Sequence, residues 1–216
     1  MKKRYVTLGF LAFFQNAYVL ADFIGISNEE FMPHYTPQHD PLWCWAASTQ
    51  MVLSYQGVKV PQAQIVLRVK GALYSNTGSI TDMINAANGL FEVEGSNTVV
   101  SGQYIHGAPL ATVLYNQLSH KRPTILNYIQ QGSNIGHAIV VTGIEASIKS
   151  QQLLVSKIYI FDPFAYNSMP DMHGSYRYVF DKNLITKNYD LFTMNDGIHI
   201  NSGVITGVIL VDGTKL

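Results

Sequence analysis

The pattern of hydrophobic residues changes near the middle of this chain, and this change limits its fold more than any other feature. Within residues 41–55, Cys44, Ser48, Met51 and Tyr55 recur at steps of four, three and four, which places them on one face of a helix. After residue 120 the chain instead contains segments rich in β-branched and aromatic residues, which are typical of strands. Helices followed by strands predict an α+β fold with a helical lobe and an antiparallel β lobe.

The same patterns give approximate element positions. Helices are predicted at residues 41–55, 61–70, 79–88 and 108–119. Ser79 and Asp82 have the spacing of a capping box at the start of the third helix, and Gly89 is its expected stop. Strands are predicted at residues 123–129, 137–146, 153–161, 176–180 and 205–211.

The N-terminus has the layout of a signal peptide. Lys2, Lys3 and Arg4 precede an apolar run over residues 6–14, and the segment Val19-Leu20-Ala21 is the expected exit. The apolar run is shorter than the roughly 20 residues that span a bilayer, so we expect cleavage after Ala21 and no remaining membrane anchor. The expected organisation is a signal peptide at 1–21 and one domain at 22–216. The expected location is secreted or periplasmic, in a bacterium.

Charge and composition exclude some partners. The chain has 14 lysines and arginines against 14 aspartates and glutamates, and no basic run follows the leader. Nucleic acid and acidic membranes are therefore not expected partners.

Cys44 is the only cysteine, so it cannot form a disulfide within the chain. A lone thiol in an exported protein is buried and inert, bound to a metal, paired between chains, or reactive. Its place at a helix N-terminus favours the reactive thiolate, because unpaired N–H groups and the helix dipole stabilise negative charge there.

A predicted hairpin supplies partners for this thiol. The segments GHAIVVTGIEA and LLVSKIYIFDP flank SIKSQQ, and a turn centred between Lys149 and Ser150 would place His137 opposite Asp162. A histidine held by a carboxylate and facing a thiol is a design for nucleophilic catalysis. Gln38, six positions before Cys44, and the Cys44 N–H are candidate donors to an oxyanion.

These residues together carry a resemblance. Gln38, the run Cys44-Trp-Ala-Ala-Ser, Gly-His137-Ala and Phe-Asp162-Pro resemble the papain-like cysteine peptidases, most of all compact bacterial members related to bacteriocin-leader peptidases. The resemblance implies a two-lobed fold with Cys44 as nucleophile, His137 as base, Asp162 as orienting residue and Gln38 as oxyanion donor. It also implies peptide or protein substrates and no cofactor.

Three further expectations concern the inhibitor, the oligomeric state and Asp162. Gln38 comes too soon after the expected cleavage site for a folded inhibitory propeptide, so any inhibitor is a separate molecule, and we expect a monomer. Several papain relatives have an amide where this chain has Asp162, so Asp162→Asn is expected to lower turnover less than His137→Ala does.

Three alternatives remain at this point. The same thiol, base and oxyanion donors would support acyl transfer to an amine instead of to water. A catalytically silent binding module could share the fold. A zinc-binding protein is the third alternative, because five residues are of types that bind zinc: His34, His39, Cys44, His137 and Asp162.

Overall fold

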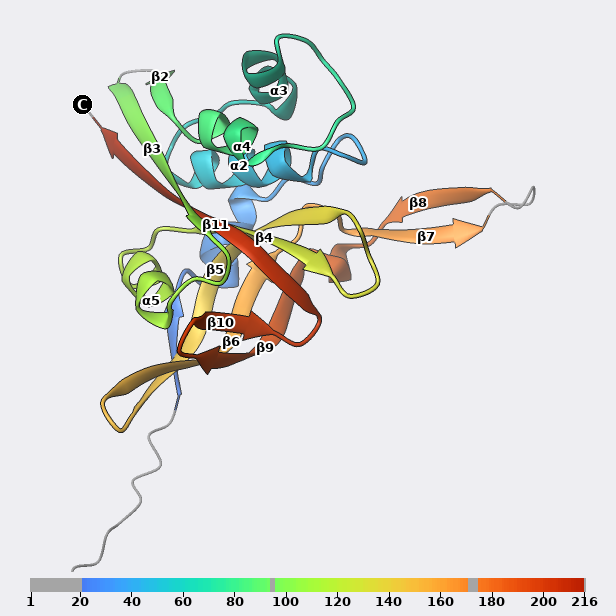
Figure 1. Cartoon of the computed structure of the whole chain (residues 1–216). Coiled ribbons are helices and arrows are strands. Elements are labelled where there is room, and N and C mark those ends of the chain that lie inside the picture. Colours follow the sequence, from blue (N-terminus) through green and yellow to red (C-terminus); the bar gives the residue numbers. More distant parts are fainter. Residues whose placement is uncertain (1–20, 94–95, 171–174, 216) are drawn as a thin grey trace, which may run out of the picture.

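The structure is a computed structural model and describes residues 21–93, 96–170 and 175–215 (Figure 1). The predicted signal peptide therefore lies outside the described residues, apart from its last position. No helix in the described ranges has the length and apolar character needed to cross a membrane.

The helices and strands alternate more than the sequence suggested. The helical elements are α1 (Asn28–Phe31), η1 (Met32–His34), α2 (Cys44–Tyr55), α3 (Gln62–Lys70), α4 (Ile80–Ala86), α5 (Ala111–Ser119) and η2 (Lys182–Leu184). The strands are β1 (Asp22–Gly25), β2 (Gly89–Val93), β3 (Ser96–His106), β4 (Thr124–Gln130), β5 (Gly136–Lys149), β6 (Gln152–Phe161), β7 (Tyr166–Pro170), β8 (Tyr176–Phe180), β9 (Thr186–Met194), β10 (Gly197–Ile200) and β11 (Gly203–Lys215).

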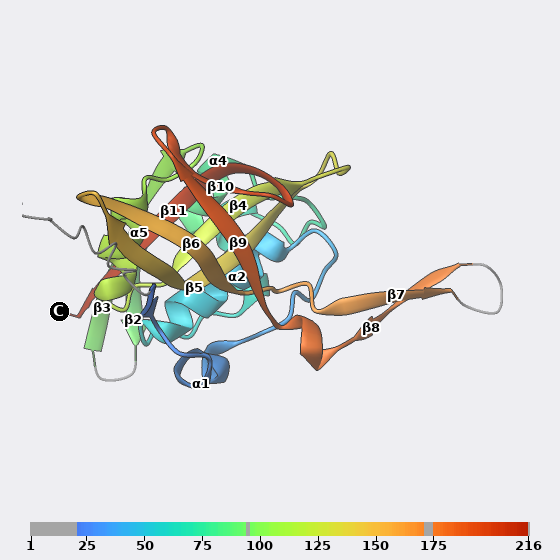
Figure 2. The same cartoon turned by 90° about the horizontal axis from the view of Figure 1, so that it is seen from below.

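Nine of the strands form one antiparallel sheet. Its order is β10-β9-β6-β5-β4-β11-β3-β2, and β1 pairs with β5. The other two strands, β7 and β8, form a separate hairpin that projects from the body of the molecule in both views (Figures 1 and 2).

Alternating residues of β5 pack into two hydrophobic clusters. Ala138 and Val140 pack with residues of α2, whereas Ile139 and Val141 pack with residues of α5. Successive side chains of a strand point to opposite faces, so α2 and α5 cover opposite faces of the sheet. Strand β5 is thus the place where the helical part of the chain meets the sheet.

The predicted α+β class is confirmed, and each predicted helix and strand is present, most of them with somewhat different bounds. The capping box at Ser79 and Asp82 is confirmed, with both reciprocal hydrogen bonds formed. Helix α2 begins at Cys44 and not at residue 41, because a turn in which the Trp43 N–H bonds the Asp40 carbonyl precedes it.

The simple order of helices first and strands second is wrong, because β1 precedes the helices and β2 and β3 precede α5. Strand β3 was missed since its sequence, SNTVVSGQYIH, contains many small and polar residues. The alternation of a strand is visible only in the exposure of its side chains: Thr98 and Val100 are buried, while Val99 between them is exposed.

The predicted register of the β5–β6 hairpin is also wrong. The turn lies at Ser150 and Gln151, whose φ angles of 50° and 64° match a two-residue type I′ turn. Lys149 therefore pairs with Gln152. Asp162 lies just past the end of β6 and is not opposite His137, which pairs with Tyr128 of β4 instead.

Candidate active site

Cys44 is the first residue of the 12-residue helix α2, and no side chain caps that helix end. The thiol thus lies beside backbone N–H groups that have no partner within the helix. The side chain is largely buried at 9% exposure. Both the free N–H groups and the positive end of the helix dipole favour negative charge on this sulfur.

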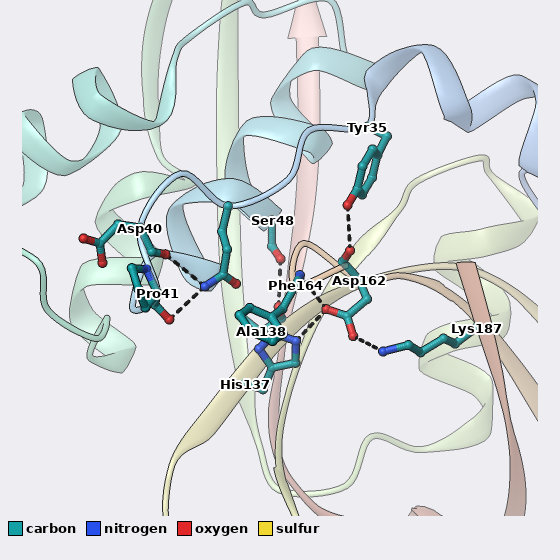
Figure 3. Close-up of polar contacts among 10 residues, drawn as sticks. Tyr35, Asp40, Pro41, Ser48, His137, Ala138, Asp162, Phe164 and Lys187 are labelled. Atoms are coloured by element: carbon teal, nitrogen blue, oxygen red, sulfur yellow. Dashed lines mark hydrogen bonds and ion pairs between the residues drawn. The ribbon is translucent and has the colours of Figure 1, made fainter. Parts of the chain in front are cut away.

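His137 and Asp162 are in contact despite the shifted register. His137 Nε2 lies 2.7 Å from Asp162 Oδ1 (Figure 3). The contact is diagonal across the sheet, where long side chains still reach one another. Asp162 Oδ1 also accepts a hydrogen bond of 2.8 Å from the Phe164 N–H, which fixes the carboxylate after the strand ends.

The bond to Asp162 determines which histidine nitrogen faces the thiol. Because Nε2 donates to the carboxylate, Nδ1 is the nitrogen left to interact with Cys44. Burial lowers the pKa of His137, but the hydrogen bonds and charges of Asp162 and Cys44 outweigh it and raise the pKa to about 9. His137 is therefore an imidazolium beside the Cys44 sulfur at neutral pH.

Asp162 is a buried carboxylate with several donors. Its side chain is 3% exposed, and Lys187 Nζ lies 2.6 Å from Oδ2, the oxygen that His137 does not use. Burial raises the pKa of Asp162, but the interactions with His137 and Lys187 outweigh it and hold the pKa below its usual value. The carboxylate thus stays ionised and can accept from His137 Nε2.

A buried hydrogen bond ties the helix of Cys44 to the strand of His137. Ser48, one turn after Cys44, donates from Oγ to the Ala138 carbonyl at 3.0 Å (Figure 3). Ser48 is fully buried, so water cannot replace the donor. This bond sets the distance between the two elements that hold the thiol and the imidazole.

We expect Ser48→Ala to weaken both folding and chemistry modestly. The change leaves a buried carbonyl without this donor, at a cost of about 1–3 kcal/mol in the free energy of unfolding. The helix start can then shift relative to β5, so alkylation of Cys44 should slow several-fold. Urea unfolding and iodoacetamide kinetics measure the two effects, and Ser54→Ala on the same helix, at a less buried position, is the matched control. A Ser48→Ala variant as stable as the parent would contradict this role.

Gln38 lies near the thiol but uses its amide elsewhere. Gln38 Nε2 donates to the carbonyl oxygens of Asp40 at 2.9 Å and Pro41 at 2.8 Å. These bonds occupy both amide hydrogens, and Oε1 has no partner among the described residues. For Gln38 to serve an oxyanion, one of the two hydrogens must leave a backbone carbonyl.

Two hollows meet at the Cys44–His137 pair. One has a volume of about 450 Å³ and is bordered by Trp45, Met83, Tyr104 and Asn127. The other, about 530 Å³, is bordered by Gln38, Asp162 and aromatic residues at the base of the β7–β8 hairpin. Both are lined by Cys44 and His137, so an extended chain lying across them would pass over the thiol.

The zinc alternative lacks its ligand cluster. No three His, Cys, Asp or Glu side chains gather as a metal site within the described ranges. His34 lies apart from the others and bonds through Nδ1 to Ser54 Oγ at 3.0 Å.

Two polar residues at the site were not found from the sequence. Lys187 is on β9, which was not predicted, and only the pairing of β9 with β6 brings it to Asp162. Asn127 is 8% exposed in β4, lines the smaller hollow, and its Nδ2 has no partner among the described residues. A polar residue in the otherwise apolar run TILNYI was the available signal for Asn127.

Comparisons with known proteins identify the family of this chain. No curated protein matches the sequence. Among solved structures, the peptidase domain of Streptococcus ComA, a bifunctional ABC transporter involved in a quorum sensing pathway, is similar at 19% identity, with a TM-score of 0.44 over 82% of this chain and 95% of that one. The model of the Peptidase_C39 like family matches residues 32–195, which include all four predicted site residues. This match covers most of the chain and confirms the predicted relation, so the chain belongs to the Peptidase_C39 like family.

Proposed function

We propose that this protein is an exported cysteine endopeptidase that hydrolyses peptide bonds through an acyl-enzyme on Cys44. The observation that supports this most is the arrangement of three groups: a thiol at a helix N-terminus, an imidazole beside it, and a buried carboxylate 2.7 Å from the other imidazole nitrogen. Thiol, base and orienting group in this order form the general machinery of nucleophilic catalysis.

The reaction follows from this geometry. The Cys44 thiolate attacks the scissile carbonyl carbon, and the carbonyl oxygen becomes an oxyanion near the Cys44 N–H and Gln38. The imidazolium of His137 gives its Nδ1 proton to the leaving nitrogen, the C–N bond breaks, and a thioester remains on Cys44. Neutral His137 then takes a proton from water, the hydroxide displaces the thiolate from the acyl group, and the carboxylic acid leaves.

A screen with quenched fluorescent peptide libraries tests this proposal. Cleavage by the parent protein, none by Cys44→Ala, and an acyl-enzyme mass on Cys44 during turnover are the expected results. Transfer of the acyl group to an added amine in preference to water would show the acyltransferase alternative. If the purified protein is alkylated rapidly at Cys44 but cleaves no peptide in any library, peptidase activity is contradicted.

The pKa of His137 predicts the alkaline limit of activity. Because the folded-state pKa is raised to about 9, the proton that the leaving nitrogen needs is present below that pH and is lost as the pH rises through it. The stabilisation from protonated His137 disappears over the same range, since it is fully present only below the unfolded value of about 6.5. We expect kcat/KM to fall near pH 9, while alkylation of Cys44, which needs only the thiolate, does not fall. A loss of kcat/KM centred near pH 7 would contradict the assignment of His137 as the acid.

Export is the second part of the proposal, and it depends on the N-terminal sequence pattern. Residues 1–21 combine a basic start with a short apolar run. N-terminal sequencing of the protein from the periplasm or medium should give Asp22 as the first residue. Recovery of the intact chain from the cytoplasm only would contradict export.

A further inference from the structure

Lys187 occupies a fixed place beside the candidate triad. Strand β9 pairs with β6 so that Lys187 is opposite Ile160, and the Asp162 N–H bonds the Ile185 carbonyl at 2.8 Å. These backbone contacts hold the Lys187 side chain on the far side of Asp162 from His137, as Figure 3 shows. The ammonium is 2.6 Å from Oδ2, and the Lys187 side chain is 30% exposed.

The two carboxylate oxygens of Asp162 therefore bind different partners. Oδ1 accepts from His137 Nε2 and from the Phe164 N–H, and Oδ2 accepts from Lys187. All three of these neighbours are donors, and a carboxylate is the side chain that offers acceptors at both positions. An asparagine has the same shape but offers one acceptor and one donor.

An amide would therefore fail in either orientation. With its oxygen toward His137, its NH₂ group faces the Lys187 ammonium, donor against donor. With its oxygen toward Lys187, its NH₂ group faces His137 Nε2, which must then accept and so shifts the proton to Nδ1. That is the tautomer that cannot act as base toward Cys44.

The charges at the site also disfavour an amide at position 162. With Lys187 present, the thiolate–imidazolium pair and the Asp162–Lys187 pair sum to zero in a largely buried site. Replacing Asp162 by an amide leaves the ammonium without its anion, which disfavours a second cation on His137.

We propose that Lys187 is a positioning residue, acting through Asp162, that makes a carboxylate obligatory at position 162. This inference rests on the proposed function, because it assigns Asp162 the task of holding His137. It explains why Asp162→Asn should still lose activity, although less than His137→Ala does. It also states the condition under which an amide at position 162 is tolerated: removal of Lys187.

A rescue experiment tests the proposal. The second-order rate of Cys44 alkylation by iodoacetamide is measured near about pH 6, where an ordinary thiol reacts slowly. The proteins are the parent, Asp162→Asn, Lys187→Met and the double variant, with Lys182→Met as a matched change at an exposed lysine in η2. We expect Asp162→Asn to lose about 10²-fold, Lys187→Met only a few-fold, and the double variant to recover to within about 10-fold of the parent. Lys182→Met should match the parent.

A spectroscopic readout separates positioning from a general structural role. ¹⁵N NMR of the His137 ring reports which nitrogen is protonated, and its pH titration reports the change in proton affinity. In Asp162→Asn we expect the Nε2 proton to be lost, and in the double variant we expect it to return. Lys187→Met alone should raise the pKa of His137, because it removes a cation near the imidazolium.

Three outcomes overturn the proposal. A double variant that alkylates as slowly as Asp162→Asn, or more slowly, shows that Lys187 does not set the requirement. An Asp162→Asn variant that alkylates like the parent shows that the amide is compatible with Lys187. If either single variant unfolds, and the His137 tautomer in its folded fraction is unchanged, the role of Lys187 is purely structural. The proposed function fails separately, if the parent itself alkylates like an ordinary thiol or cleaves no peptide.

Discussion

Replacing His137 with alanine should lower kcat/KM by about 10⁴-fold or more, with the fold intact. The change removes both the acid that protonates the leaving nitrogen and the cation that favours the Cys44 thiolate. The fold should tolerate it for a specific reason. Asp162 would stay buried, but Lys187 at 2.6 Å and the Phe164 N–H at 2.8 Å still bind its carboxylate.

Peptide hydrolysis, alkylation rate and thermal unfolding of His137→Ala measure these effects together. His199→Ala is the matched control, since His199 lies on the edge strand β10, bonds Asp196 and lines neither hollow at the site. Parent-like hydrolysis by folded His137→Ala would rule out His137 as the base. Complete unfolding would show that the imidazole is needed for the structure. It would contradict the expectation that Lys187 and the Phe164 N–H suffice to stabilise the buried Asp162 carboxylate.

Gln38→Ala should lower kcat by about 10²–10³-fold and change KM little. In this prediction the amide binds charge that exists mainly in the transition state, so acylation suffers most. Because Nε2 bonds two backbone carbonyls at rest, the variant should also lose about 1 kcal/mol of stability. Alkylation should remain near the parent rate, since iodoacetamide forms no tetrahedral oxyanion.

Gln62→Ala is the control that separates the two roles of Gln38. Gln62, the first residue of α3, is also a buried amide that supports this loop, through bonds to the His39 N–H and the Pro37 carbonyl, but it does not line either hollow. We expect Gln62→Ala to lose stability and keep most of its turnover. If both variants lose turnover in proportion to stability, Gln38 supports the loop and is not an oxyanion donor.

The sequence predicted local features well and long-range geometry poorly. The helix that carries Cys44, predicted from residue 41 and found from Cys44, and the capping box at Ser79 depend on neighbouring residues, so their signals are present in a short window. The β5–β6 hairpin was predicted with its turn one position too early, because Ser150 and Gln151 both adopt positive φ although neither is glycine, asparagine or aspartate.

The His137–Asp162 contact was predicted from a wrong register and is nevertheless present. An added residue in β5 at Thr142 and another in β6 at Ser156 offset each other, so neither bulge changes the final alignment. Asp162 reaches His137 from a position just past the end of β6, where its N–H bonds the Ile185 carbonyl immediately before β9. No short sequence window contains that information, and the same holds for Lys187, whose place depends on the pairing of two distant strands.

The pH dependence of Cys44 alkylation, with the labelled residue identified by mass spectrometry, tests the central claim most directly. A thiolate paired with the His137 imidazolium should react with iodoacetamide rapidly at about pH 5–6, and His137→Ala should abolish this rapid phase. A parent rate that is slow in this range and rises only around pH 8.5, as for a free thiol, would contradict a catalytic Cys44.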